Sequence, residues 1–471
     1  MTTTAATQPL SFEQRLDASR ITRVMWLLWA LSAGLIALDG FDFFIIGVTI
    51  PFLQRDFGLG SAEIGAVAVA AVAGSLVGSL TLGPITDKIG RQTMLMVDVA
   101  IFVIATAGTV LAWNATSLIV FRFLVGVGIG ADYPISVSYI TENVPSRWRG
   151  RMVIGAFTFQ AVGALLGAAT GLITIYLFQT IYPDSTQPAI HYAWRWMLGV
   201  GLVLVIVVGI LRFSFLLESP RYYIVKGDYE AASKAASTLL DEPIVITSET
   251  ELPEREPSLQ YRALFSPQYR RGTVLASVPW FLQDIATYGI GIFTPTIIGF
   301  LAFASEENFM IKEIATAKGA AFVDLFLIAG FLLAILLIDR VGRIKLQIVG
   351  FLGMAVGLLI LAAASVLALG KDPNIAIVFI GFLVFNLMMN AGPNSTTFLL
   401  SGEVFPTSIR ASGAGFAGAV AKAGAVLGTF GLPTLQKSLG VPTVMLLLSI
   451  LCVLASVITY IYQVETTGRS P

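Results

Sequence analysis

The sequence predicts an all-α membrane protein in which twelve transmembrane helices form two pseudo-symmetric six-helix bundles. Three observations support this fold class: an apolar composition, twelve long apolar segments, and an internal repeat that relates the two halves of the chain. Of the 471 residues, 56% are hydrophobic and only 12% are charged, and the mean hydropathy is +0.82. A soluble domain carries about 25% charged residues, so this composition indicates a chain that lies in a bilayer.

Twelve apolar segments are long enough to cross a bilayer, for which a helix needs about 20 residues. We expect them near residues 24–50, 63–84, 94–112, 117–140, 152–178, 197–216, 272–300, 319–338, 346–369, 375–400, 411–435 and 441–463. The longest polar stretch separates the sixth segment from the seventh. The expected organisation is therefore an N-terminal bundle over 1–221, a central cytoplasmic loop over 222–270 and a C-terminal bundle over 271–471.

The distribution of Lys and Arg predicts the orientation of the chain. With both termini in the cytoplasm, six of the 29 basic residues face outward, Arg122 and Lys422 lie inside the membrane, and the remaining 21 are cytoplasmic. An excess of Lys and Arg in cytoplasmic loops is the rule for multi-pass proteins. The N-terminal tail lacks the short apolar region and cleavage site of a signal peptide. We expect the first apolar segment to be retained and the protein to reside in the plasma (inner) membrane.

Residue counts disfavour several classes of function. Cys452 is the only cysteine and His191 the only histidine, so we expect no disulfide, no Cys or His metal site and no Ser-His-Asp triad. The net charge is zero, without the basic patch that nucleic acid requires. We therefore expect no enzyme, no metal, no cofactor and no nucleic-acid partner.

Charged residues inside the apolar segments are the strongest functional signal. Asp132 lies in the fourth segment and Lys422 in the eleventh. An ionised side chain at that depth costs from about 3 to more than 10 kcal/mol, and such residues usually mark a transport pathway or a proton relay. Asp39 and Asp42 share one side of the first segment, where a carboxyl in low dielectric can hold a proton near neutral pH. We expect Asp132, Asp42 and Asp39 to handle protons, although Asp39 has a structural or entrance role as its alternative.

A stripe of large polar residues follows one face of the seventh segment. Trp280, Asp284 and Tyr288 recur at intervals of four residues, which places them on one side of a helix. Large residues in a stripe usually serve packing, but an acid at the centre of this one, inside the membrane, favours a pathway.

An internal repeat relates the loops of the two halves. Residues 87–91 (DKIGR) return as 339–343 (DRVGR), and the Glu, Pro and Arg of 142–149 return with the same spacing in 403–410. The offsets of 252 and 261 residues suit the length of one six-span half. A parallel duplication of this kind places the substrate between the halves, near the bilayer midplane.

The repeat also relates polar residues inside the membrane. An offset of 262 residues takes Asp132 to Asn394 and Gln160 to Lys422. In the first span of each half, the pattern Asp-x4-Gly occurs at 42–47 and again at 284–289. Polar side chains are therefore expected at equivalent depths in the two bundles.

These loops resemble a known signature. Residues 83–91, with Gly83, Asp87, Gly90 and Arg91, are similar to the loop signature of the major facilitator superfamily. Residues 218–221 (ESPR) and 465–469 (ETTGR) resemble the branch that contains sugar porters and phosphate:proton symporters. The resemblance covers nearly the whole chain and implies loops that latch the cytoplasmic side shut. The implied gating residues are Asp87, Arg91, Glu142, Arg149, Glu218, Arg221, Asp339, Arg343, Glu403 and Arg410.

The intramembrane polar residues resemble the pattern of phosphate:proton symporters. The phosphate site that this resemblance implies consists of Tyr133, Gln160, Trp280, Asp284, Tyr288 and Asn394, with Lys422 beside them. It also implies that Lys422, Asp42 and Asp132 serve charge balance and proton coupling. Two departures are Ala131, where a glycine is common, and a 222–270 loop that is shorter than in many fungal relatives.

We therefore expect a monomeric, proton-coupled importer of inorganic phosphate that works by alternating access. Arsenate, which is nearly isosteric with phosphate, is expected to bind too. Residues 39–42 (DGFD) also resemble aromatic-acid:proton symporters, so an organic or aromatic acid that stacks on Trp280 and Tyr288 is the alternative substrate. A neutral sugar and a non-transporting nutrient sensor are further alternatives.

Overall fold

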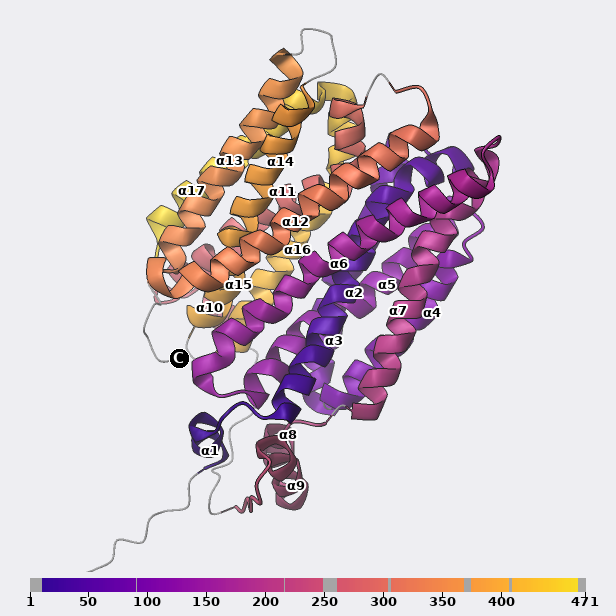
Figure 1. The fold of residues 1–471 in the computed structure, drawn as a ribbon. Helices are drawn as coiled ribbons and strands as arrows, with labels where there is room; N and C mark the ends of the chain where they lie inside the picture. Colours follow the sequence, from indigo (N-terminus) through magenta and orange to yellow (C-terminus); the bar gives the residue numbers. More distant parts are fainter. Residues whose placement is uncertain are drawn as a thin grey trace, which may run out of the picture.

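The computed structural model describes residues 11–89, 91–215, 217–248, 261–303, 306–367, 374–405 and 409–464. Within this part of the chain, eleven helices are long and apolar enough to cross a membrane, and the apolar stretch Ala115–Gly130 makes a twelfth. The crossing helices (Figure 1) are α2 (Arg23–Phe57), α3 (Ser61–Ile89), α4 (Arg91–Val110), α5 (Ala115–Asn143), α6 (Ser146–Ile181), α7 (Trp194–Phe215), α11 (Arg270–Ala302), α12 (Phe309–Val341), α13 (Arg343–Leu367), α14 (Ile375–Ala391) with α15 (Pro393–Glu403), α16 (Arg410–Leu439) and α17 (Val441–Tyr462). The predicted all-α fold is confirmed. The exact residue boundaries that we expect for the bundles and the central loop stay a prediction.

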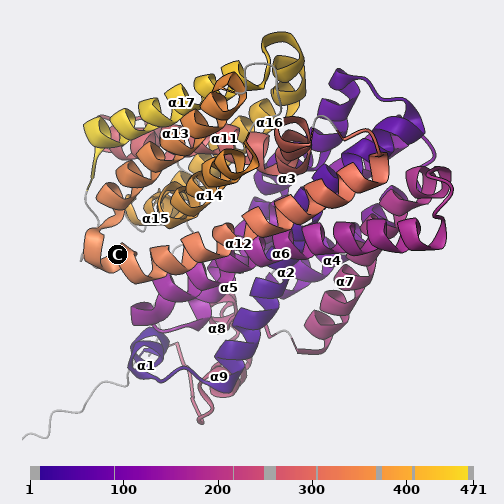
Figure 2. The same cartoon turned by 45° about the horizontal axis from the view of Figure 1, so that its top comes forward.

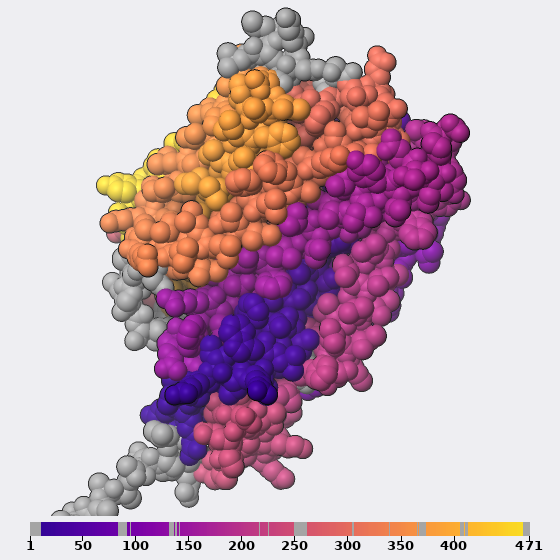
Figure 3. All heavy atoms as spheres, in the orientation of Figure 1, coloured from indigo at the N-terminus to yellow at the C-terminus, as the bar shows by residue number. Residues whose placement is uncertain are grey.

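Helix packing follows the sequence repeat. In the first half α2 packs on α6 and α3 packs on α5, and in the second half α11 packs on α16 and α12 on α14. Across the interface α6 lies against α12 and α3 against α16. A pseudo-two-fold axis that exchanges the halves also exchanges these two contacts. Figures 2 and 3 show the orange α12 lying along the magenta α6 where the halves meet.

Short helices mark one end of the molecule, which we name the α9 end. The helices α1 (Phe12–Ala18), α8 (Pro220–Lys226) and α9 (Tyr229–Leu240) lie beyond the bundles in Figure 1. Apolar side chains of α1 and α9 share one buried cluster, which includes Phe12, Leu16 and Ala236. We name the opposite end, where α2 and α11 finish, the far end.

Two glycines let α2 approach its neighbours at backbone distance. A Cβ added at Gly40 would lie 2.0 Å from the carbonyl oxygen of Gln160 on α6. A Cβ added at Gly47 would lie 1.9 Å from the carbonyl oxygen of Ile292 on α11, in the other half. Small residues permit such close helix contacts inside a membrane. The first contact holds the N-terminal half together, and the second joins the two halves.

The two halves also touch through aromatic side chains at the far end. The rings of Phe52 and Phe309 are edge-to-face with centroids 5.1 Å apart. The guanidinium of Arg55 lies 3.7 Å from the centroid of the Phe309 ring, a cation–π distance. A Cβ added at Gly65 on α3 would lie 2.8 Å from the carbonyl oxygen of Phe430 on α16. These contacts close the far end.

The tenth span contains a break that the sequence analysis did not predict. We expected one helix over 375–400, whereas α14 ends at Ala391 and α15 begins at Pro393. Gly392 between them has φ −116° and ψ −102°, which is outside the helical region. Pro393 has no N–H to continue the helical ladder, and proline is favoured at the first position of a helix.

Candidate substrate and proton site

Lys422 of α16 lies against aromatic side chains from both halves. Its Nζ donates a hydrogen bond to the hydroxyl oxygen of Tyr288 on α11 at 2.6 Å. The same Nζ is 4.4 Å from the centroid of the Tyr288 ring and 5.8 Å from that of Phe43 on α2. The rings of Phe43 and Tyr288 meet edge-to-face with centroids 5.6 Å apart. An intramembrane cation therefore stands where α2, α11 and α16 meet.

Two carboxylates lie within electrostatic reach of this ammonium group. Both Asp284 and Asp39 interact with the charge of Lys422. Asp284 is 2% exposed, and the side chain of Trp280, one turn earlier on α11, interacts with its carboxylate. Its Oδ2 has no hydrogen-bond partner within the described part of the chain. One buried acceptor next to a lysine is thus left for a ligand that brings a hydroxyl group.

Asp42 lies in a separate ion pair. The guanidinium of Arg122 on α5 donates to Asp42 Oδ1 at 2.9 Å from Nη1 and to the Asp42 backbone oxygen at 3.2 Å from Nη2. Arg122 is fully buried and Asp42 is 6% exposed. The sequence predicted Arg122 inside the membrane but not its partner. The structure places its partner on another helix, so the two acids of α2 face different cations.

A chain of amide and hydroxyl groups connects α11 to α14 and α15. The side-chain amide of Gln283 donates to Asn394 Oδ1 at 3.1 Å and to Thr287 Oγ1 at 3.0 Å. Asn394 donates to Asn390 Oδ1 at 2.7 Å, and Thr397 donates to Gln283 Oε1 at 3.2 Å. The sequence predictions did not include Gln283, although a glutamine inside an apolar segment, one residue before Asp284, was a readable signal. In the structure Gln283 is fully buried. The network fixes the position of Asn394.

Gln160 and an aromatic contact complete the surroundings on the α9 side. Gln160 is half-buried on α6, and its backbone lies against Gly40, the residue after Asp39. Phe157, about one turn nearer the α9 end, meets Phe398 of α15 with ring centroids 4.2 Å apart. Phe398 in turn meets Trp280 edge-to-face at 5.9 Å. This aromatic bridge between the halves lay outside the sequence predictions.

Other predicted residues fall partly outside the described structure. Asp132 and Tyr133 lie on α5, Asp87 on α3, Arg91 on α4, Asp339 on α12 and Arg410 on α16, and their side chains are outside the described part. The predicted gating residues whose side chains are described make contacts within their own half of the molecule. Arg343 pairs with Glu403 at 3.3 Å, and Glu218 Oε2 accepts from the backbone N–H of Gln92 at 2.9 Å.

The remaining gate residues also bind near the α9 end. Arg149 Nε donates to the carbonyl oxygen of Val144 at 3.4 Å, and Arg221 pairs with Glu13. Glu142 is half-buried on α5. Among the described residues, no group of three His, Cys, Asp or Glu side chains could hold a metal ion.

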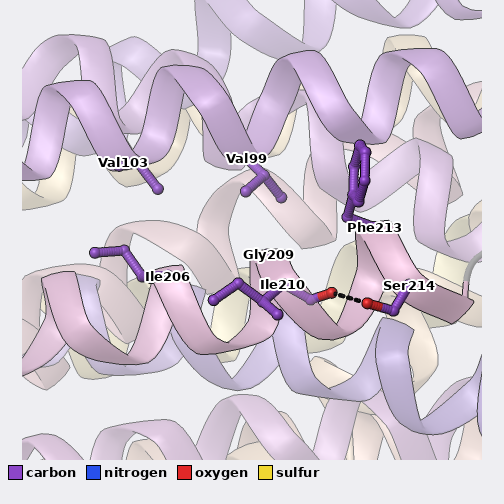
Figure 4. A pocket seen from close by; sticks show the side chains of 7 residues that line it. All are labelled: Val99, Val103, Ile206, Gly209, Ile210, Phe213 and Ser214. Atoms are coloured by element: carbon purple, nitrogen blue, oxygen red, sulfur yellow. Dashed lines mark hydrogen bonds between the residues drawn. The ribbon is translucent and has the colours of Figure 1, made fainter.

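A larger groove lies away from these polar residues. It has a volume of about 340 Å³ between α4 and α7, and Figure 4 shows the side chains that line it. They are apolar apart from Ser214, whose hydroxyl donates to the carbonyl oxygen of Ile210. Ile210 and Phe213 are 62% and 78% exposed on a membrane-spanning helix. The groove thus suits lipid hydrocarbon rather than a polar solute.

Comparison with known proteins agrees with the fold. The sugar (and other) transporter family matches residues 27–470. A protein of Arabidopsis thaliana named as a probable inorganic phosphate transporter (1-6) is 30% identical over 466 residues, covering 92% of this chain and 90% of that protein. YaaU of Escherichia coli, whose name assigns it only to metabolite transport, is 29% identical over 447 residues, covering 94% and 92%.

Solved structures show the same architecture. The xylose transporter XylE from E. coli, in a partially occluded inward open conformation, has a TM-score of 0.75 at 19% identity over 96% of this chain and 100% of that chain. This likeness supports the fold alone. The family match over nearly the whole sequence shows that the chain belongs to the sugar (and other) transporter family of the major facilitator superfamily and is a multi-pass membrane transporter, not an enzyme.

Proposed function

We propose that the protein imports inorganic phosphate together with protons by alternating access. The observation that carries the proposal is the Lys422 ammonium, placed between the halves with Asp284 and Tyr288 beside it. An anion such as H2PO4⁻ needs a positive charge, hydrogen-bond donors for its oxygens and an acceptor for its hydroxyl groups. Lys422, Tyr288 and Trp280 supply the first two, and the free Oδ2 of Asp284 supplies the third.

Proton coupling follows from the energy of moving an anion. Each elementary charge that crosses the membrane costs about 2.3 kcal/mol per 100 mV. With the α9 end in the cytoplasm of a cell whose interior is negative, inward movement of phosphate alone is opposed. Protons that travel with the anion cancel or reverse this cost. Relatives that are named as phosphate transporters support the same substrate.

The proposed cycle uses the acids around Lys422. With the far end open, protons neutralise acids of the pathway, among which we place Asp39, Asp42 and Asp132, and phosphate binds beside Lys422. Asn394 and Gln160 contribute further hydrogen bonds, and Tyr133 lies on α5 close in sequence to Asp132. The halves then close the far end and open the α9 end. There Asp39 loses its proton, pairs with Lys422 and displaces the anion.

Uptake into proteoliposomes tests the proposal. Radiolabelled phosphate should accumulate faster under an inward proton gradient, and uptake that ignores the gradient would exclude coupling. Lys422→Ala should abolish uptake, whereas Lys437→Ala, which removes an exposed lysine of the same helix, should not. Asp284→Asn should weaken phosphate binding measured by calorimetry. Normal phosphate affinity in Lys422→Ala would refute the role of this lysine.

A sugar substrate is the second candidate, because solved neighbours are named as xylose transporters. A neutral sugar does not require the buried ammonium of Lys422. A thermal-shift screen of the purified protein against phosphate, arsenate, sulfate, xylose and benzoate separates the substrate classes. Stabilisation by xylose or benzoate but not by phosphate would replace the proposed substrate.

A further inference from the structure

An acid that the proposed cycle does not use lies at the middle of α12. Asp324 is fifteen residues after Phe309, where α12 begins, and seventeen before Val341, where it ends. At about 1.5 Å per residue, its Cα is more than 20 Å from either end of the helix. The residue is 7% exposed. It belongs to neither repeat motif, and no hydrogen bond or ion pair joins it to another described side chain.

Asp324 borders a small cavity that both halves enclose. The cavity measures about 10 Å³, close to the smallest volume that holds one water molecule. The wall that the N-terminal half contributes consists of Phe44 and Val48 of α2 and Ala164 and Ala168 of α6. A Cβ added at Gly291 would lie 2.6 Å from the ring of Phe44, so the two halves touch directly at the cavity.

The wall that the C-terminal half contributes offers hydrogen-bond acceptors. Gly291, Thr294 and Pro295 of α11 line the cavity, and glycine can line it only with its backbone. Pro295 has no N–H, so it cannot satisfy the carbonyl group four residues earlier, which is that of Gly291. Thr294 donates its hydroxyl hydrogen to the carbonyl oxygen of Ile290 at 3.0 Å. A protonated carboxyl, which is a donor, fits these surroundings, whereas a carboxylate finds only other acceptors.

Charged groups on the packed helices are directed elsewhere. On α2, Asp42 pairs with Arg122, Asp39 interacts with Lys422, and Arg55 stacks on Phe309. On α11, Asp284 and Tyr288 interact with Lys422, and on α6 the ring of Tyr176 contacts Lys318. Arg343 of α13 pairs with Glu403 of α15, and on α12 itself Glu313 interacts with Lys312 and Arg55. Helix α14 carries no titratable residue. No charged side chain of the described residues interacts with Asp324, and only burial acts on its carboxyl.

We propose that Asp324 is a second proton-binding site, which takes up a proton when the far end closes and releases it when the far end opens. Opening removes the wall formed by α2 and α6, so water reaches the carboxyl and it ionises. Closure restores the small cavity, which has room for one water molecule at most, and an unpaired charge there is costly. One proton enters from the outer side at closure and returns there at opening, so the site moves no net charge. It makes the conformational equilibrium depend on external pH.

The inference rests on the alternating access of the proposed function but not on its substrate. It predicts that acid outside favours the closed far end. One proton bound in one state and not in the other changes the ratio of the two populations by up to tenfold per pH unit. Asp324→Asn, which is neutral at every pH, should remove the contribution of Asp324 to the pH dependence. It should also keep the far end closed at alkaline pH.

Distances between spin labels at the far end test this inference without phosphate. Labels on Ser185→Cys and Glu307→Cys in a Cys452→Ala background report on the two halves, since both residues are exposed at the far end. The open population should rise with pH in the parent protein and fall below it in Asp324→Asn. Glu230→Gln is the control, an exposed acid of α9 at the opposite end of the molecule, and should keep the parent pH dependence.

An unchanged pH dependence in Asp324→Asn would overturn the proposal. A second measurement covers the case in which this variant folds poorly. Infrared difference spectra of the parent protein between acid and alkaline pH should contain the C=O band of one protonated carboxyl that Asp324→Glu shifts. A spectrum that Asp324→Glu leaves unchanged would also exclude the site. Because neither measurement uses phosphate or flux, a wrong substrate would leave both results in place.

Discussion

Replacement of Gly47 by alanine should hold the far end open. The Cβ of the new side chain would lie 1.9 Å from the carbonyl oxygen of Ile292 when the halves are closed as observed. Real Cβ atoms essentially never come nearer than 3.0 Å to a non-bonded heavy atom. Helices α2 and α11 must therefore separate by at least 1.1 Å (3.0 minus 1.9) before the variant can adopt this state. The nearest atoms belong to the backbone of α11, so no flexible side chain can move aside to relieve the clash.

The cost falls on one conformation only. Overpacking of a close contact typically costs about 1–3 kcal/mol. Gly47 and Ile292 lie on different halves, so the clash disappears when the far end opens. The full cost then acts on the equilibrium between states, and 1–3 kcal/mol corresponds to about a 5- to 150-fold shift toward the open far end. Uptake should fall in proportion to the lost closed population, while the folded structure persists.

Spin-label distances and uptake measure this effect directly. Gly199→Ala is the neutral control, since nothing lies within 4 Å of a Cβ at that position on α7. Gly40→Ala is the contrasting control, because its clash with Gln160 lies within one half and should lower thermal stability without favouring either state. If Gly47→Ala shows parent distances and parent uptake, the reasoning from the α2–α11 contact is wrong.

Two further substitutions probe the buried polar groups. Arg122→Ala leaves Asp42 as an unpaired buried charge, so it should destabilise the protein by about 3–5 kcal/mol; a thermal unfolding temperature equal to that of the parent would contradict the pairing. Gln283→Leu keeps the volume but deprives Asn394 and Thr397 of a partner, with an expected cost of about 1–2 kcal/mol inside the membrane. Calorimetry should also find weaker phosphate binding, and unchanged affinity would separate this network from the site.

The sequence was sufficient for the fold because both of its signals act over long stretches of chain. Twelve apolar segments reflect the length that a bilayer demands, and the repeated loops of 87–91 and 339–343 reflect a duplication. The break inside the tenth span left a weaker signal in the sequence. Gly392 and Pro393 were readable as a helix break, but the apolar run continues through them, and transmembrane helices often tolerate both residues.

The partners of the charged residues could not be predicted in the same way. Asp42 and Arg122 are 80 positions apart, and their contact depends on how α2 and α5 are rotated about their axes. Asp39 and Asp42 are three residues apart and were therefore predicted on one side of a helix. That side is wide enough for Asp39 to interact with Lys422 and for Asp42 to pair with Arg122. Asp324 escaped notice for another reason: it stands alone in an apolar run without a motif.

These pairings break the symmetry of the duplication. Asp42 and Asp284 occupy matching positions in the repeat, but Arg122 of α5 balances the first and Lys422 of α16 the second, and these two helices are not repeat equivalents. Asp42 and Arg122 both lie in the N-terminal half, so rocking of the halves does not move these two side chains apart. Lys422 instead interacts with Asp39 across the interface, so the same motion changes its partner. In the proposed cycle only Lys422 exchanges a carboxylate for a bound anion as the halves move, and that cycle requires phosphate to compete with Asp39 in the far-end-closed state.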